Sequence, residues 1–327
     1  MKRVLIVLTA GLALIVGMCA ETPKPVNPDL AKQPTLYVVG YAHLDTEWNW
    51  EYPQTISEYI LNTMRKNFDL FEKYPHYVFN FSGANRYRMM KEYFPADFAK
   101  VKKYVDSGRW FVSGSSMEEN DVNSPSAESI IRQILYGKQF FRKEFGKTSE
   151  EYELPDCFGF PASLPSILAH MGLKGFSTQK LSWGSSAPAG GPNSPENTPL
   201  GTPFNVGIWE GPDGKSVIVA LNPGSYSGGI YGDLTKSPAP GPSREPDWVK
   251  RVQTNGELTG VFADYHYFGT GDIGGAPDEP SIKLLEAIVT KSKTVLPPAR
   301  GERGGVVGGR DDHAGAARAD AVAADGD

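Results

Sequence analysis

The stretch that decides the fold is VVGYAHLDTEWNW, which runs from Val38 to Trp50. Its first part is a short, continuous run of apolar and β-branched residues, which predicts a buried strand. Its second part places His43, Asp45 and Trp48 directly after that strand. Because residues i and i+2 of a strand point to the same side, His43 and Asp45 can converge on one ion. An imidazole nitrogen and a carboxylate oxygen suit zinc, although two ligands do not complete a site.

Strand-like and helix-like segments alternate along the rest of the chain. Apolar residues at spacings of three and four between Thr55 and Lys73 predict an amphipathic helix. The same alternation predicts further strands at 77–83, 109–115, 152–156 and 175–179, and helices at 96–108, 124–146, 163–172 and 281–292. Residues 204–221 hold two strand-like runs around Asp213-Gly214, which predicts a β-hairpin. Residues 265–280 are expected to form a glycine-rich turn region.

Strands that alternate with helices imply parallel pairing and right-handed crossovers. The sequence therefore predicts an α/β fold, either a barrel or a doubly wound sheet, and of the two we favour a barrel. Both architectures place functional residues in the loops that leave the carboxyl ends of the strands. The segments that begin at His43, at Ser115 (SSMEEND) and at Pro155 (PDCFGF) all occupy such positions.

The composition is that of a globular protein without a surface for nucleic acid. The chain has 327 residues, 40% hydrophobic and 22% charged, which suffices for one large domain or two ordinary ones. A formal net charge of -5 and a sequence pI near 5.7 provide no basic patch for phosphate groups, so we expect no nucleic-acid partner. Phosphate-cradling loops, Ser-centred nucleophile elbows and C-x-x-C pairs are absent from the sequence, which argues against nucleotide-dependent and thiol chemistry.

Residues 1–20 have the layout of a secretory signal, with two basic residues, an apolar run and then small residues. The run is short for a membrane span, so a retained signal anchor is the less favoured alternative. Cys19 stands where a bacterial lipoprotein carries its lipid, which leaves lipidation and simple cleavage both open, and such an anchor would be the chain's only contact with a membrane. We expect an exported protein of the bacterial periplasm or cell surface. Residues 21–34 read as a Pro-rich linker, and Cys157 as a small buried side chain without chemistry.

Residues 300–327 differ in kind from the rest of the chain. They contain no Leu, Ile, Phe, Tyr, Trp or Lys, and codons that begin with G or C can encode every residue type in them. This is the composition of a GC-rich reading frame read out of register, so we expect a frameshift near Ala299. An ordinary low-complexity tail is the alternative, and neither version can form a core. The folded domain is therefore predicted to span residues 35–299.

Each candidate site residue also has a structural explanation. A His-x-Asp triplet alone is equally typical of a surface histidine followed by a helix-capping aspartate. Trp48 and Trp50 can hold a sugar against an aromatic ring, while core packing is the alternative, and it is stronger for Trp50. Asp156, between a predicted strand and helix, is suited to bind a metal, to act as a nucleophile, or only to cap the helix.

Two acidic segments remain after these candidates. Glu118, Glu119 and Asp121 are expected to lie in a solvated loop, with Asp121 the residue that points inward. Asp272 lies among glycines in GTGDIGG, which allow a ligand to approach the backbone closely. A tight turn explains Asp272 equally well.

Three motifs, in this order, resemble glycoside hydrolase family 38, the zinc-dependent retaining α-mannosidases. They are HLDTEWNW from His43, GRWFVSGSSMEENDVNSPSAESIIRQILYGKQFFRKEFG from Gly108, and PDCFGFPASLPSIL from Pro155. The resemblance covers Tyr37 to Ser292. It implies a seven-stranded β/α barrel as the catalytic domain, here incomplete, and mannose-containing glycans as substrates.

The resemblance also implies roles for individual residues. Zinc would be held by His43, Asp45 and Asp156, together with a later histidine, and Asp156 would also be the nucleophile. Trp48 is similar to the family's tryptophan that stacks under the bound mannose. Asp272 is the nearest match to the family's general acid.

The chain departs from the family pattern in two respects. The helical bundle and β-sandwich domains that follow the family's catalytic domain have no counterpart, and His313, in the anomalous tail, matches no motif for the fourth zinc ligand. We therefore expect a truncated or frameshifted chain of α-mannosidase lineage that is inactive or poorly folded. Two rival hypotheses are a zinc-dependent polysaccharide deacetylase on a related barrel, which would use metal-bound water instead of a carboxylate nucleophile, and a non-enzymatic remnant that at most binds sugar.

Overall fold

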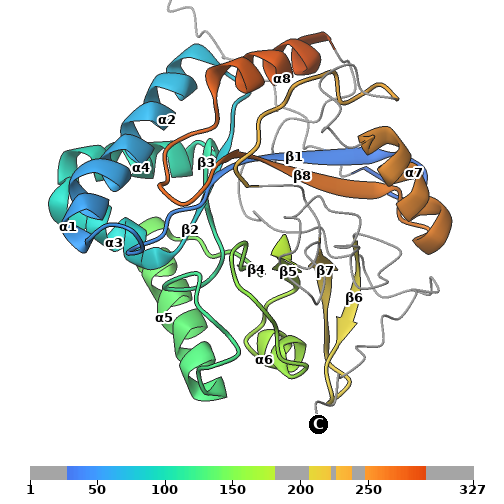
Figure 1. The fold of residues 1–327 in the computed structure, drawn as a ribbon, viewed down its shortest axis with the longest axis horizontal. Helices are drawn as coiled ribbons and strands as arrows, with labels where there is room; N and C mark the ends of the chain where they lie inside the picture. The colour runs from blue at the N-terminus through green and yellow to red at the C-terminus, as the bar shows by residue number, and fades with distance from the viewer. Residues whose placement is uncertain (1–27, 181–205, 222–225, 238–246, 292–327) are drawn as a thin grey trace, which may run out of the picture.

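The computed structural model describes residues 28–180, 206–221, 226–237 and 247–291, whose arrangement is shown in Figure 1. Several predicted features lie outside these residues: the signal sequence with Cys19, the first half of the 21–34 linker, and the 300–327 tail with its suspected frameshift. Within the described part of the chain, no helix is both long enough and apolar enough to span a membrane.

Strand β1, Thr35–Ala42, lies inside a four-stranded parallel sheet of order β3-β2-β1-β8. Its neighbours are β2 (Phe79–Ser82) and β8 (Ala263–Thr270), and β3 (Trp110–Ser113) pairs with β2. The β1–β8 pairing extends over the full length of both strands. The predicted first strand is confirmed, and its last three residues are buried.

The second sheet also has four strands, in the order β4-β5-β7-β6. Strands β4 (Glu151–Glu153), β5 (Gly175–Ser177) and β7 (Ser216–Ala220) are parallel. Strand β6 (Val206–Glu210) pairs antiparallel with β7, as the predicted hairpin requires. Gly214 in the connecting turn has φ +76°, a conformation that glycine adopts without steric cost.

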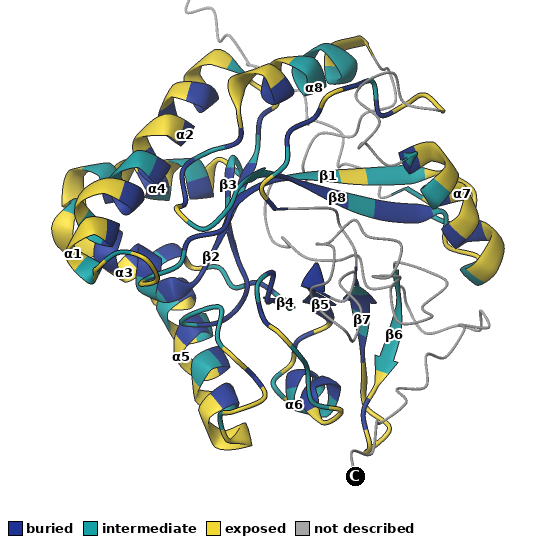
Figure 2. Ribbon diagram, viewed as in Figure 1, coloured by how far each residue is buried: buried dark blue, intermediate teal, exposed yellow. Residues whose placement is uncertain are grey.

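Helices line the outside of the two sheets in Figure 1, and Figure 2 shows their buried residues on the sides that face the sheets. The helical segments are α1 (Tyr52–Gln54), the π-helical η1 (Thr55–Ile60), α2 (Leu61–Lys73), α3 (Ala84–Tyr93), α4 (Pro95–Asp106), α5 (Ala127–Phe145), α6 (Leu164–His170), α7 (Trp248–Thr259) and α8 (Glu279–Lys291).

The apolar core is divided between the two sheets. Around the first sheet, the ring of Trp110 lies 4.9 Å from that of Phe79 and 6.4 Å from that of Tyr87, measured between centroids. Tyr152 and Phe176 are buried in a second cluster around β4, β5 and β7. Burying an apolar side chain of this size stabilises the fold by about 1.5–3 kcal/mol. This packing therefore stabilises the strands of both sheets.

The α/β class and the parallel pairing are confirmed, but the strands of the described residues do not close into one hydrogen-bonded barrel. They form two sheets, which side chains join across the interior. The Ser177 hydroxyl of β5 lies 2.5 Å from the Tyr265 hydroxyl and 3.0 Å from the Tyr267 hydroxyl of β8. On the other side, the Gly114 N–H after β3 donates to the Glu151 carboxylate of β4 at 3.2 Å. Strands β4 and β5 are only three residues long. Side-chain contacts join the two sheets where backbone hydrogen bonds between them are lacking in the described residues.

Two local predictions differ from the structure. Residues 265–270, expected as part of a glycine-rich turn, are the end of β8, because pairing with β1 along the whole strand overrides the turn signal of its glycines. Helix α5 begins after Ser126, whose hydroxyl accepts from the Ser129 N–H, so the cap is Ser126 and not Ser124, as the 124–146 assignment implied. The predicted helix between Thr55 and Lys73 is confirmed, and it begins with the π-helical turn η1.

Candidate metal centre and active site

His43 and Asp45 lie where the β1–β8 pairing continues beyond both strands. The His43 N–H donates to the Thr270 carbonyl at 2.9 Å, and the Asp45 N–H donates to the Asp272 carbonyl at 2.8 Å. The Gly274 N–H then donates to the His43 carbonyl at 2.8 Å. These backbone bonds place Asp272, which follows β8, beside the His43/Asp45 segment, although more than two hundred residues separate them in sequence.

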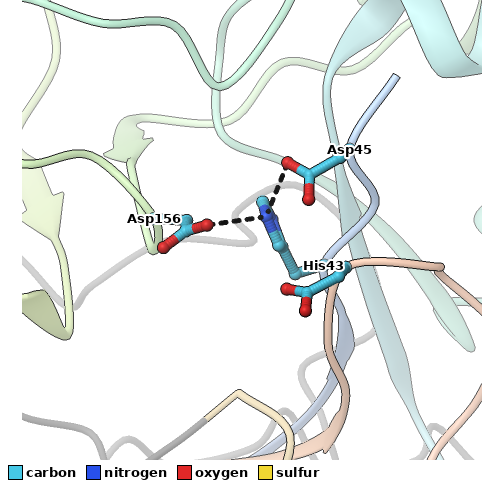
Figure 3. Close-up of side chains that lie close together, drawn as sticks. His43, Asp45 and Asp156 are labelled. Atoms are coloured by element: carbon cyan, nitrogen blue, oxygen red, sulfur yellow. Dashed lines mark ion pairs between the residues drawn. The ribbon is translucent and has the colours of Figure 1, made fainter. Parts of the chain in front are cut away.

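Asp156 reaches the same place from the second sheet, three residues after β4 ends at Glu153. One of its carboxylate oxygens lies 3.6 Å from His43 Nε2, and an Asp45 oxygen lies 3.3 Å from the same nitrogen. Figure 3 shows the imidazole between these two carboxylates. The strand ends of both sheets therefore supply one cluster.

The cluster contains four side chains. One potential ligand atom from each of His43, Asp45, Asp156 and Asp272 lies within 4.8 Å of the other three. His43 is buried, and the three aspartates are partly buried. The structure thus brings together all three predicted metal ligands and adds Asp272, which the sequence analysis considered as a general acid or as a tight-turn residue.

These residues fit a zinc ion. His43 Nε2 is buried and makes no hydrogen bond within the described part of the chain, so its lone pair has no protein donor. Zinc takes nitrogen and carboxylate ligands at about 2.0–2.2 Å, and ligand atoms around a tetrahedral ion stand about 3.3–3.5 Å apart. The 3.3 Å and 3.6 Å separations around Nε2 are close to that spacing.

The charges around His43 favour a cation at Nε2. Burial alone would lower the pKa of His43, but the negative charge of Glu119 and the neighbouring Asp156 and Asp45 carboxylates raise that pKa well above its usual value. A proton and a metal ion therefore compete for the same nitrogen, and metal binding would release the proton.

Lys180, which follows β5, forms an ion pair with Asp156. Burial acts to raise the pKa of Asp156, but the neighbouring His43 and Lys180 lower it overall. The Lys180 ammonium also lies 4.7 Å from the centroid of the Phe158 ring. Sequence reasoning missed Lys180. Its only signal was its place at the end of a predicted strand.

Glu119 was also missed, because the acidic cluster was predicted to be a solvated loop with Asp121 inward. The structure reverses this prediction. Asp121 is exposed and accepts from the backbone N–H groups of Asn123 and Ser124. The side chain of Glu119 is only 2% exposed, and its carboxylate lies 2.6 Å from His43 Nδ1. Asp121 points outward because the N–H groups that it accepts from belong to its own turn. Glu119 can lie inside because the buried guanidinium of Arg86 compensates its charge.

Asp272 has a strained backbone, with φ +65°, and its carboxylate accepts from the Tyr226 hydroxyl at 3.0 Å. The Tyr226 ring lies 4.8 Å from the imidazole of His43, measured between centroids. The tight-turn explanation for Asp272 is therefore true of its backbone, but its side chain takes part in the cluster.

Trp48 is 63% exposed and meets only the edge of Trp50, at a centroid distance of 5.9 Å. Trp50 packs in turn against Tyr59 at 4.8 Å, as a packing residue should. Phe158, two residues after Asp156, is 73% exposed. Exposed aromatic side chains thus follow the cluster residues in two of the segments that supply it.

Residues 33–300 match the family described as "Glycosyl hydrolases family 38 N-terminal domain". The chain belongs to this family. It is 34% identical over 253 residues to alpha-mannosidase G of Dictyostelium discoideum, a match that covers 77% of this chain and 21% of that protein. It is 30% identical over 256 residues to human alpha-mannosidase 2C1, with 78% of this chain and 22% of that protein covered.

The fold of this family 38 chain is similar to the crystal structure of an alpha-mannosidase from Enterococcus faecalis V583. The TM-score is 0.58 at 20% sequence identity, and the match covers 79% of this chain and 27% of that one. The family 38 chain spans about a fifth of the length of the curated relatives that it matches.

Proposed function

We propose that this chain carries the catalytic centre of a zinc-dependent retaining glycosidase that releases α-linked mannose from glycans. The observation that carries the proposal is the cluster of His43, Asp45, Asp156 and Asp272, in a family 38 chain whose relatives are named alpha-mannosidases. His43, Asp45 and Asp156 offer one nitrogen and two carboxylate oxygens, which suit zinc. When bound, zinc would act as a Lewis acid toward oxygen atoms of the sugar.

Asp156 is the proposed nucleophile. It must be ionised to attack, and the neighbouring His43 and Lys180 keep its pKa low. Its carboxylate would bond to the anomeric carbon of the mannose as the bond to the leaving oxygen breaks, which gives a covalent glycosyl–enzyme. Water would then displace Asp156 and release mannose with its original anomeric configuration.

Asp272 is the proposed general acid. Retaining glycosidases hold the nucleophile and the acid about 5–5.5 Å apart. The nearest oxygens of Asp156 and Asp272 lie within 4.8 Å of each other, and Tyr226 holds Asp272 in place. As acid, Asp272 would protonate the leaving oxygen, and it would take a proton from the attacking water in the second step. An acid carries its proton and a zinc ligand does not, so Asp272 cannot fill both roles at once.

Covalent trapping tests the proposal. The zinc-loaded chain is incubated with an activated 2-fluoro or 5-fluoro α-mannoside, and the labelled peptide is identified by mass spectrometry. The sequence alone predicted an inactive or poorly folded chain. Because the cluster residues come together, we instead expect one label, on Asp156, and hydrolysis of an aryl α-mannoside. Asp156→Asn should remove both, while Asp121→Asn, an exposed control in the loop after β3, should keep both.

Two outcomes would contradict this mechanism. An active enzyme without label on Asp156 would have a different nucleophile, as a deacetylase-type hydrolase has. A folded chain that binds zinc but neither labels nor hydrolyses would retain a metal site without the proposed activity.

We also propose that the chain is exported, on the basis of residues 1–20 alone. Cell fractionation with an epitope tag placed in the exposed turn at Asp213 should recover the mature chain outside the cytoplasm. Recovery of a full-length chain with an intact N-terminus from the cytoplasm would refute export.

A further inference from the structure

Glu119 is one of the most buried charged side chains near the cluster, with 2% of its side chain exposed. One carboxylate oxygen lies 2.6 Å from His43 Nδ1. The other accepts from the hydroxyls of Tyr41 and Ser82 and, at 3.0 Å, from Arg86 Nη1. Four donors therefore surround the carboxylate, and they come from β1, β2, α3 and the His43 segment.

Arg86 extends this contact to the backbone of the metal-binding segment. Its second terminal nitrogen, Nη2, donates to the carbonyl of Leu44, the residue between His43 and Asp45. Its Nη1 also donates to the Ser82 carbonyl at 3.1 Å. The Glu119–Arg86 pair therefore holds both the imidazole of His43 and the peptide that separates His43 from Asp45.

The two nitrogens of His43 have different surroundings. Nδ1 lies against Glu119, while Nε2 is the atom that faces Asp45 and Asp156. A carboxylate accepts hydrogen bonds and cannot donate one, so Nδ1 must carry the proton. With the proton at Nδ1, the lone pair of a neutral imidazole is at Nε2, on the side of the three aspartates.

We propose that Glu119 is a positioning residue, which holds His43 in the orientation and tautomer that present Nε2 to the metal. The inference rests on the proposed zinc site and goes beyond it, because Glu119 is not one of the four residues of the cluster. Partners of this kind raise metal affinity by roughly 10- to 100-fold in other proteins. Through Arg86, Glu119 would also help to fix the peptide between His43 and Asp45, in addition to the strand pairing, so that both residues present their ligand atoms together.

Glu118 provides a matched control. It is the preceding residue in the same loop, and its carboxylate accepts from Asn85 Nδ2 at 2.5 Å and from the Thr46 hydroxyl at 3.2 Å. Within the described residues, the Glu118 carboxylate makes no hydrogen bond to His43. Glu118→Gln therefore alters the charge of the loop in the same way as Glu119→Gln and leaves the imidazole alone.

The test measures metal binding by the full-length chain, not turnover. Zinc dissociation constants are obtained by competition with a chromophoric chelator, for the unaltered chain, Glu119→Gln and Glu118→Gln, after circular dichroism shows that each is folded. We expect Glu119→Gln to weaken zinc binding by about 10- to 100-fold. Glu118→Gln should change it by less than about threefold.

A second readout isolates the imidazole. With cobalt(II) in place of zinc, proton NMR should show one strongly shifted N–H signal from His43 that exchanges slowly with solvent, because Nδ1–H is buried against Glu119. The signal should persist in Glu118→Gln and broaden or vanish in Glu119→Gln. A role for Glu119 in packing alone would not move this signal.

The outcomes separate this inference from the proposed function. If the unaltered chain binds neither zinc nor cobalt, both the metal site and the positioning role fail. If it binds zinc and Glu119→Gln binds with equal affinity, only the positioning role fails. If Glu119→Gln does not fold, the unaltered chain still decides, because a rapidly exchanging His43 N–H in its cobalt form would overturn the inference.

Discussion

Asp156 and Asp272 enter the same cluster with different partners. Asp156 faces the ammonium of Lys180 and the imidazole of His43, while Asp272 accepts from the hydroxyl of Tyr226. A carboxylate beside positive charge is favoured in its ionised form, as a nucleophile must be. The nucleophile role proposed for Asp156 agrees with these neighbours.

Asp272→Asn separates the acid role from the ligand role. As a general acid, Asp272 contributes most when the leaving group is poor, so we expect kcat/KM for methyl α-mannoside to fall by about 10²- to 10⁴-fold. Hydrolysis of a dinitrophenyl α-mannoside, whose leaving group needs no proton, should fall far less. Steady-state kinetics with both substrates and the zinc dissociation constant measure these effects. Equal losses with both substrates, together with weaker zinc binding, would identify Asp272 as a ligand instead.

Trp48→Ala should affect the sugar and not the fold. Because the side chain is 63% exposed, we expect the free energy of unfolding to change by less than about 0.5 kcal/mol. Loss of a ring beneath the sugar should raise KM by about tenfold, which corresponds to about 1.4 kcal/mol. Urea unfolding and aryl mannoside kinetics measure the two effects. Tyr136→Ala, an exposed aromatic on the outer helix α5, is the control, and an equal KM change there would refute sugar stacking by Trp48.

At the scale of elements, helix α5 supports the loop that carries Glu119. The backbone of this loop lies directly against the helix: the Met117 N–H donates to the Gln133 carbonyl at 3.1 Å. One turn further along the helix, a Cβ added to Gly137 would lie 2.4 Å from the carbonyl carbon of Ser116. Only glycine allows this approach. The packing therefore requires glycine at position 137, although glycine has a low helix propensity.

Gly137→Ala should therefore destabilise the protein, although alanine is the better helix former by about 1 kcal/mol. The contact is with backbone, which cannot rotate away, and we expect a loss of about 1–3 kcal/mol in the free energy of unfolding. Urea denaturation gives the value. Gln139→Ala, at an exposed position of the same helix, should be within about 0.5 kcal/mol of the unaltered chain. A more stable Gly137→Ala variant would mean that the loop does not lie against α5.

At the scale of the whole molecule, the interior between the two sheets is polar. Glu153 of β4 is buried there beside Tyr267 of β8, and burial, with the negative charge of Glu119 added, raises the pKa of Glu153 to about 8. Burial likewise raises the pKa of Glu151 to about 7. Arg86 and His43 instead hold the pKa of Glu119 well below its usual value, despite burial. Interior carboxyl groups thus differ sharply in their protonation.

These shifts predict how stability depends on pH. Between the ordinary glutamate pKa of 4.5 and the folded value of about 8, Glu153 holds a proton in the folded chain that the unfolded chain has lost. The folded state therefore binds more protons, and stability falls as pH rises through this window. Glu119 acts in the opposite direction, because its contribution is present above pH 4.5 and is lost as pH falls below it. We expect maximal stability at mildly acidic pH.

Glu153→Gln should flatten the decline toward pH 8, because an amide has no proton to lose. A single group can contribute at most about 1.4 kcal/mol per pH unit. Urea unfolding at pH 5 and pH 8 should show a smaller difference for Glu153→Gln than for the unaltered chain, with the exposed Glu257→Gln as control. Parallel profiles for all three chains would show that Glu153 is ionised in the folded protein at pH 5.

Local signals were sufficient for much of the fold and for the first half of the site. The apolar run before His43, the spacing in α2 and α5, and the Asp213-Gly214 turn each specify an element from neighbouring residues alone. Strand β8 was missed because its residues pair along their whole length with β1, and no local pattern records a partner so far away in sequence. Glu119 and Asp121, two residues apart, could not be ranked, because only Arg86 and His43 distinguish the buried carboxylate from the exposed one.

The sequence by itself determined the α/β class, the family and the residue types of the site: an imidazole and carboxylates at the ends of strands. Only the tertiary structure decided which carboxylates meet. The β1–β8 pairing brings Asp272 to Asp45, β4 brings Asp156 to His43, and Arg86 draws Glu119 into the interior. The physical reason is that helix, strand and turn signals act over a few residues, whereas a metal site needs ligand atoms a few ångströms apart from segments that only parallel pairing and burial bring together.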